Sequence, residues 1–210
     1  MSRLYNYPGP EDPDRSSKMS GKNFQIFSLV ARITLKRELA QELADEINRF
    51  SVYDLQYVSA RLEKDISDLP SPYREKIRPY FMEQYFGRYN RIMTMRGSGE
   101  LEKIEGEIKD PELFRDFCRM ITARYPDREL QDEPEEYTQG SPFNSLFYYL
   151  ISIFYMFVLD EPGHPAGMPF PGGFTVREHD GVVYCPIRDK EKDVEYSICN
   201  FCPAKQDDEF

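Results

Sequence analysis

Three of the four cysteines lie close to the end of the 210-residue chain, in a pattern that could bind a metal ion. Cys199 and Cys202 form a Cys-x-x-Cys pair in "CNFCPAKQD", and Cys185 precedes them in "YCPI". A tight turn brings the two paired Sγ atoms together, and the proline after Cys202 stiffens the chain around the sulfur. Zn²⁺ takes four Cys or His donors in a tetrahedron, so the pattern predicts a metal site with one ligand still to be found.

The fourth ligand decides what such a site does. His164 is the candidate, because it lies between Gly163 and Pro165 in a rigid loop, and His179 and Cys118 are alternatives. If His164 binds, the site is closed and structural. If His164 is instead a loop histidine bonded to the backbone, three cysteines leave a position open for water and Lewis-acid chemistry.

Zinc is the expected metal, and an iron–sulfur cluster is the alternative, because clusters take thiolates and sometimes imidazole. A redox dithiol is disfavoured, since the thioredoxin-type pair lies in a βαβ unit that does not surround this one. Ordinary structural burial of the cysteines is a further interpretation. A C-terminal segment with little apolar content would gain order from a metal. The residues favour a structural zinc site, with a metalloenzyme or iron–sulfur redox protein as the alternative.

Other chemical signals in the sequence fail. Glu161 and His164 have the spacing of a di-iron helix motif, but the Pro and Gly between them oppose a helical turn. The paired glycines of "PFPGGF" lack the Lys-Ser/Thr of a P-loop. The sequence has two histidines and no G-x-S-x-G motif. It therefore indicates no Ser-His-Asp triad, and no catalytic residue is assigned. Cys118 has the spacing of a helix core residue rather than of a nucleophile.

The charge of the chain argues against two classes of partner. A formal net charge of −10 does not suit general nucleic-acid binding or docking on anionic membranes. The basic and aromatic segment 73–96 could form a nucleic-acid face, but its apolar residues fall at helical spacing. An aromatic core on one side with solvated arginines on the other is favoured there. The N-terminal stretch has no apolar h-region, so a reducing cytoplasm is expected. A protein partner or a homo-oligomer stays open.

Helices are the elements expected to position these residues. Residues 1–20 are predicted to be a disordered tail, because they are rich in Pro, Gly, Ser and charge. Residues 21–159 are predicted to form a helical bundle, since their apolar residues recur at three- and four-residue intervals. Capping patterns predict helix starts; they lie at Ser20, Ser51, Ser71-Pro72, Asp110-Pro111 and Ser141-Pro142. Pro79 is expected to end or kink its helix.

A long uncharged run, 137–159, has the length of a membrane span. Polar residues in its first half leave about 14 apolar residues, nearer a buried core helix than a span. No Lys or Arg flanks either end to set an orientation. The run is therefore expected to be the central helix of the bundle, with membrane association through residues 141–159 as the alternative.

Residues 160–210 are expected to form a Cys/His-containing module packed on the bundle. A hairpin is predicted in it, with strands Thr175-Val176 and 182–184 around the turn at 179–181. The fold class is therefore mainly α, a helical bundle with a small loop-rich C-terminal module that contains a short β-hairpin.

The C-terminal module also carries distinctive motifs: "HPAGMPFPGGF", "YCPI" and "CNFCPAKQD". The segment that they span, residues 164–207, resembles an uncharacterised archaeal family found mainly in methanogens. The resemblance implies a cytoplasmic protein of a strictly anaerobic archaeon and brings no established activity with it. That background favours the iron–sulfur alternative more than the residues alone do, since such cells use clusters freely.

Overall fold

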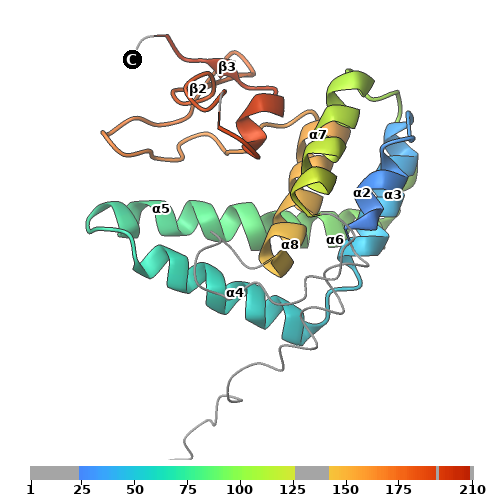
Figure 1. Ribbon diagram of the computed structural model, residues 1–210, viewed down its shortest axis with the longest axis horizontal. Coiled ribbons are helices and arrows are strands. Elements are labelled where there is room, and N and C mark those ends of the chain that lie inside the picture. The colour runs from blue at the N-terminus through green and yellow to red at the C-terminus, as the bar shows by residue number, and fades with distance from the viewer. Residues whose placement is uncertain (1–23, 126–141, 193, 209–210) are drawn as a thin grey trace, which may run out of the picture.

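The computed structural model describes residues 24–125, 142–192 and 194–208, which form a mainly α-helical protein. Its α-helices are α2 (Gln25–Val30), α3 (Lys36–Ile47), α4 (Val52–Ser67), α5 (Tyr73–Met82), α6 (Arg88–Ser98), α7 (Pro111–Arg124) and α8 (Pro142–Ile153) (Figure 1). Two π-helices are η1 (Glu83–Gly87), between α5 and α6, and η3 (Phe154–Val158), after α8. Two short 3-10 helices are η2 (Leu101–Lys103) and η4 (Ile198–Phe201).

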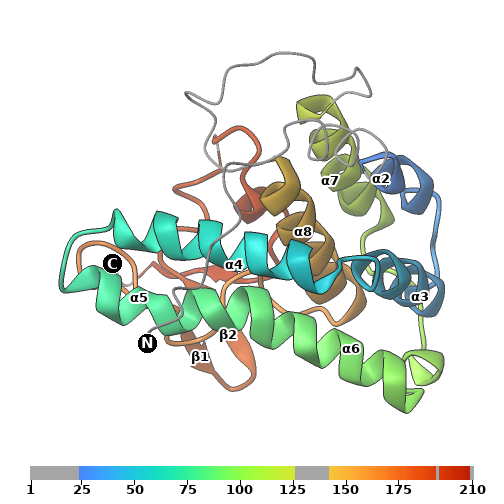
Figure 2. The same cartoon turned by 90° about the horizontal axis from the view of Figure 1, so that it is seen from below.

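Helix α8 and its continuation η3 form the centre of the hydrophobic core. Every residue from Leu146 to Val158 is buried except Tyr148, which is partly exposed. Helices α3 and α4 contact α8, and the ring of Phe117 on α7 packs edge-on against Tyr149 (Figure 2). The apolar run is thus a buried core helix, as predicted. Within the described ranges, no helix is both long and apolar enough to cross a membrane.

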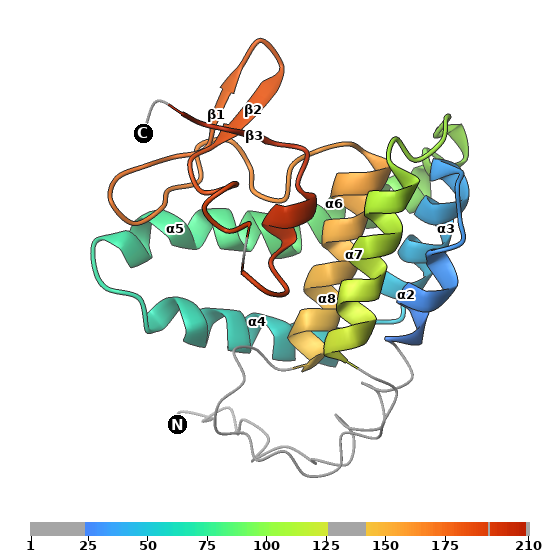
Figure 3. The ribbon, with the colours of Figure 1, turned by 45° about the horizontal axis from the view of Figure 1, so that its top comes forward.

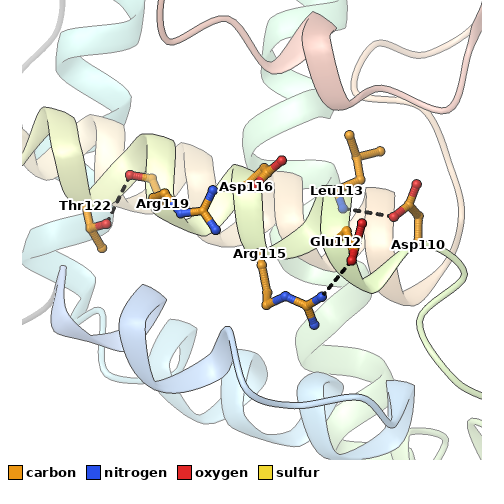
Figure 4. Close-up of polar contacts among 7 residues, drawn as sticks. All are labelled: Asp110, Glu112, Leu113, Arg115, Asp116, Arg119 and Thr122. Carbon is orange, nitrogen blue, oxygen red and sulfur yellow. Dashed lines mark hydrogen bonds and ion pairs between the residues drawn. The ribbon is translucent and has the colours of Figure 1, made fainter.

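Side-chain caps begin two of the helices as the sequence indicates. Ser51 Oγ accepts the Asp54 N–H at 3.2 Å, and Asp54 accepts the Ser51 N–H at 2.8 Å, which completes a capping box for α4. Asp110 Oδ1 accepts the Leu113 N–H at 2.9 Å and caps α7 (Figure 4). Helix α5 begins at Tyr73, one residue later than expected. The predicted caps at residues 20 and 141 lie outside the described residues.

Pro79 was expected to end or kink its helix, and it does not end it. It lies inside α5, which runs on through η1 into α6 as one helical rod along α4 (Figure 2). Proline removes one backbone hydrogen bond. Aromatic residues around it, Tyr80, Phe81 and Tyr85, pack against the core and hold the chain helical. Tertiary packing therefore outweighs the local break.

The C-terminal segment contains a three-stranded sheet of β1 (Arg177–His179), β2 (Val182–Cys185) and β3 (Lys205–Gln206). Strands β1 and β2 are antiparallel, and β3 adds parallel to β2. Asp180 and Gly181 have φ of 50° and 73°, as a two-residue hairpin turn requires. That turn pairs His179 with Val182, so the first strand begins two residues later than predicted; Thr175 instead bridges to Pro169.

Helix η4 holds the C-terminal segment against the helical body. Figures 1 and 3 show η4 beside α7, with the sheet on one side of the α5–α6 rod. The ring of Phe201 on η4 packs edge-on against Phe117 of α7, with 5.0 Å between centroids. Ile198 and Ala204 are buried in the same apolar cluster as α8. The cysteine-bearing segment therefore shares the core of the helices.

Candidate functional site

Cys185, Cys199 and Cys202 are buried neighbours in the C-terminal segment. Cys185 ends β2, Cys199 lies in η4, and Cys202 follows that helix directly. Their exposed fractions are 3%, 5% and 7%, and all three thiols are free. The Cys202 N–H donates to the Cys199 carbonyl at 3.3 Å, while Ser197 Oγ accepts the Cys199 N–H at 3.3 Å. The tight turn expected between the paired cysteines is present.

The three thiols are close enough to influence one another electrostatically. Burial raises the pKa of Cys199 to about 11, and both Cys202 and Cys185 act in the same direction. Burial also raises the pKa of Cys185, to which Cys202 contributes. Ionising any one thiol thus makes the next harder to ionise, unless a cation is added. A divalent metal ion is the kind of charge that reverses this effect.

An ion pair with a buried carboxylate holds strand β3 beside Cys185. Asp207 is 2% exposed, and its carboxylate accepts from Arg177 Nε at 2.7 Å and Nη2 at 2.6 Å. The Asp207 N–H donates to the Cys185 carbonyl at 3.1 Å. Gln206 reaches back to the Pro186 carbonyl at 3.3 Å. These bonds hold β3 against β2 and so set the position of Cys185.

The loop that precedes His164 contacts the cysteine cluster through its main chain. The Gly163 N–H donates to Cys202 Sγ at 3.4 Å. A Cβ on Gly163 would lie 2.6 Å from Ile198 Cδ1, so glycine permits the close approach to η4. The His164 ring itself packs edge-on against Phe170, with 5.6 Å between centroids. Burial, with the positive charge of Arg88, lowers its pKa to about 4, so the imidazole is neutral near pH 7.

The side chains of the four predicted metal ligands do not converge on one point. Within the described residues, no group of three or more His, Cys, Asp or Glu side chains is arranged to hold a metal ion. The structure gathers the three cysteines and places the His164 ring against Phe170. Of the alternative ligands, His179 is exposed at the end of β1 beside Asp180, and Cys118 is buried in α7 with a pKa raised to about 12 by burial. The Cys118 thiol is thus a core residue, as expected.

Arg88 and Gln84 belong to the site, although sequence reasoning placed the arginines of segment 73–96 in solvent. Arg88 is 5% exposed and Gln84 is 2% exposed. Both donate to the Gly163 carbonyl, at 2.8 Å and 2.9 Å. They lie on the helix face that also buries Ile77 and Ile92. Spacings of seven, four and four along 77, 84, 88 and 92 are the sequence signal that could have revealed them.

A cleft of about 1040 Å³ lies between the helical body and the C-terminal segment. Arg88, Tyr155 and Lys205 line it. Of the four predicted ligands, all within the described part of the chain, Cys202 alone lines the cleft. The cleft therefore reaches one edge of the cysteine cluster.

Comparison with known proteins identifies relatives over most of the chain. The sequence profile of a family described as "uncharacterized protein conserved in archaea (DUF2115)" matches residues 35–207. A UPF0305 protein of Methanocaldococcus jannaschii is 29% identical over 173 residues, which cover 82% of this chain and 97% of that protein. A UPF0305 protein of Methanopyrus kandleri is 34% identical over 140 residues, covering 67% and 88%. No solved structure matches the chain.

Proposed function

Because the chain belongs to the archaeal DUF2115 family, whose description states no activity, we propose its function from the cysteine cluster: it binds zinc through Cys185, Cys199 and Cys202. The observation that carries the proposal is the burial of three free thiols, from two separate segments, within electrostatic reach of one another. Thiolate sulfur and neutral imidazole are the ligands that zinc prefers.

His164 is the fourth ligand in this proposal. Its imidazole is neutral at pH 7, which is the form that binds metals. Its neighbour Gly163 already touches Cys202 Sγ. The ring must turn away from Phe170, and the thiols must rotate, to close a ligand set. A closed site of this kind is structural: it links β2, η4 and the loop before His164, which are distant in sequence.

Metal content tests the proposal directly. The full chain, purified without oxygen and with reduced thiols, should retain one zinc ion per molecule. Cys199→Ser and Cys202→Ser should abolish retention, whereas Cys118→Ser, which alters another buried cysteine, should not. Absence of metal from the wild-type protein, even after zinc is added, would refute the proposal. His164→Gln should weaken retention if the imidazole is the fourth ligand.

A metalloenzyme is the second candidate, favoured by the contact between Cys202 and the cleft. If His164 stays on Phe170, a three-cysteine site keeps an open position for water or substrate. Added imidazole should then change the visible spectrum of the cobalt-substituted protein, whereas a closed site should not respond. An iron–sulfur cluster, the remaining alternative, would show as visible colour with bound iron and sulfide in the protein as purified.

A further inference from the structure

We propose that the cleft between the helical body and the C-terminal segment binds a small organic carboxylate. The negative charge of the ligand lies on Arg88, and its apolar part lies against η3. This proposal does not depend on the zinc site. It assigns a class of ligand to a cavity that a closed, structural zinc site leaves unused.

The floor of the cleft is apolar apart from one cation. The buried part of the lining, which we call the floor, consists of Arg88, Tyr155, Met156, Phe157, Cys202 and Ala204. Three of these are consecutive residues of η3, and π-helices occur often at functional sites. Arg88, at 5% exposed, is the one floor residue of the described chain that carries a charge. A ligand that reaches the floor therefore meets apolar surface and a single positive charge.

The charge of Arg88 has no carboxylate bonded to it among the described residues. Its hydrogen bonds go to two neutral carbonyls, those of Pro162 and Gly163, both at 2.8 Å. Glu161, the acid whose charge acts on it, is bonded to Arg91 at 2.8 Å instead. A buried cation is costly without an anion nearby. An anion that enters the cleft would supply the missing charge.

Arg88 is held in place and still has donors to offer. A guanidinium carries five N–H groups in one plane. Two of them are used within the described ranges, on the loop carbonyls. The Tyr155 ring lies 4.2 Å from the guanidinium carbon, which limits the orientations of the group and offsets part of the cost of its burial. The remaining donors suit the planar, two-oxygen acceptor of a carboxylate.

The rim of the cleft disfavours anions of higher charge. Its charged residues are mostly exposed, and acids slightly outnumber bases: Glu83, Asp110, Asp160, Glu161 and Glu178 against Arg91, Lys109, Arg188 and Lys205. A polyanion such as a nucleoside triphosphate would meet like charges there. A single carboxylate is balanced by Arg88 alone. The volume of about 1040 Å³ leaves room for an apolar body behind it.

Methionine methyl groups can report binding from inside the cleft. Met156 lines the cleft, whereas Met95 is buried in α6 and does not line it. The full chain, isotope-labelled at its methionine methyl groups, is titrated with naphthoate, octanoate, neutral naphthamide and naphthyl phosphate, and followed by nuclear magnetic resonance. Both carboxylates should shift the Met156 signal, which Met156→Leu identifies, and leave the Met95 signal in place.

The charge of the probe should decide its affinity. Naphthamide has the shape of naphthoate without its charge and should bind about tenfold more weakly, since it loses a charged hydrogen bond to Arg88. Naphthyl phosphate carries a second negative charge and should also bind more weakly than naphthoate, because of the acids at the rim. The four probes thus separate a carboxylate site from a phosphate site and from a purely apolar one.

Variants separate contact with the ligand from anchoring of the loop. Arg88→Met should weaken naphthoate binding about tenfold and leave naphthamide binding unchanged. Arg88→Lys should fall between Arg88→Met and the wild type. Gln84→Met removes the other bond to the Gly163 carbonyl, at 2.9 Å, but Gln84 does not line the cleft, so it should bind naphthoate normally. Arg96→Met, which removes an exposed arginine paired with Asp45, should also bind it normally.

Four results would overturn the proposal. A Met156 signal that moves with neither carboxylate would show that the cleft holds no such site. Equal affinity for naphthoate and naphthamide would remove the charge from recognition, and tighter binding of naphthyl phosphate would overturn the choice of a carboxylate. Equal losses in Gln84→Met and Arg88→Met would make Arg88 an anchor of the loop. If Arg88→Met fails to fold by circular dichroism, Arg88→Lys decides: weakened naphthoate binding supports the proposal and wild-type affinity refutes it.

Discussion

Asp207 shows how much one buried side chain can determine at this site. Its carboxylate is bound at two points by Arg177, and its N–H reaches the carbonyl of Cys185. A two-point bond between a guanidinium and a carboxylate fixes orientation as well as distance. The register of the final strand, and with it the place of Cys185, depends on this pair.

Asp207→Asn should lower the free energy of unfolding by about 2 kcal/mol, because a buried charged hydrogen-bond partner is lost. Urea unfolding of the metal-free chain measures the change. Asp116→Asn is the matched control: it breaks an exposed pair with Arg119 on α7 and should cost less than about 0.5 kcal/mol. Equal losses in the two variants would contradict the role given to Asp207.

His164 should make the metal-free protein sensitive to mild acid. Its pKa is about 4 in the folded chain and 6.5 in the unfolded chain, so between these values the unfolded state binds the extra proton. Stability from this residue is therefore complete above pH 6.5 and falls as the pH drops toward 4, by about 3 kcal/mol in all. Urea unfolding with a chelator present should show a smaller loss for His164→Gln than for the wild type. Parallel losses would contradict the prediction.

Helix α7 connects its N-terminal cap to the cysteine-bearing helix η4. Asp110 accepts a backbone N–H of the first turn (Figure 4). Farther along the same helix, the ring of Phe117 packs against Phe201 of η4. Glu112–Arg115 and Thr122–Arg119 are local contacts on the solvent side of the same helix. The cap therefore supports the surface on which the cysteine-bearing η4 rests.

Asp110→Ala should destabilise the chain by about 1 kcal/mol, since one N–H in the first turn of α7 loses its acceptor. Thermal unfolding followed by circular dichroism gives the shift. Glu112→Ala, in the same first turn but 88% exposed, should change stability by less than about 0.5 kcal/mol. A larger effect at Glu112 than at Asp110 would show that the cap is not what stabilises the helix start.

Among the residues that the structure describes, the bundle and the C-terminal segment share a continuous core. The apolar cluster around α8 includes Cys118 of α7 as well as Cys185, Ile198 and Cys202 of the C-terminal segment. A segment whose apolar residues are buried on the bundle cannot leave it without exposing both surfaces. The bundle and the module should therefore unfold together.

Thiol labelling in urea tests this cooperativity with internal probes. In the metal-free protein, Cys118 and Cys202 should become reactive at the same urea concentration, which should match loss of helical circular dichroism. Cys118 reports on the bundle and Cys202 on the C-terminal segment. Labelling of Cys202 at distinctly lower urea would show that the module opens independently of the bundle.

Local patterns in the sequence predicted much of the fold and part of the site. The helical class, the central apolar helix, the caps at Ser51 and Asp110 and the turn between Cys199 and Cys202 follow from spacing within a few residues. Two predictions were wrong: that the helix could end at Pro79, and the position of the first strand of the hairpin. Packing of aromatic residues kept α5 helical. The two-residue turn at 180–181 pairs the second strand with residues 177–179 rather than with the predicted 175–176.

The sequence by itself determined the mainly helical fold and supplied the candidates for metal ligands. Only the tertiary structure decided that Cys185 lies beside the Cys-x-x-Cys pair, that the His164 ring rests on Phe170, and that Arg88 is buried. The physical reason is the separation along the sequence of the residues that interact. Caps and periodicity depend on neighbours in the chain, whereas the hydrogen bonds of buried Arg88 go to a loop 74 and 75 residues away.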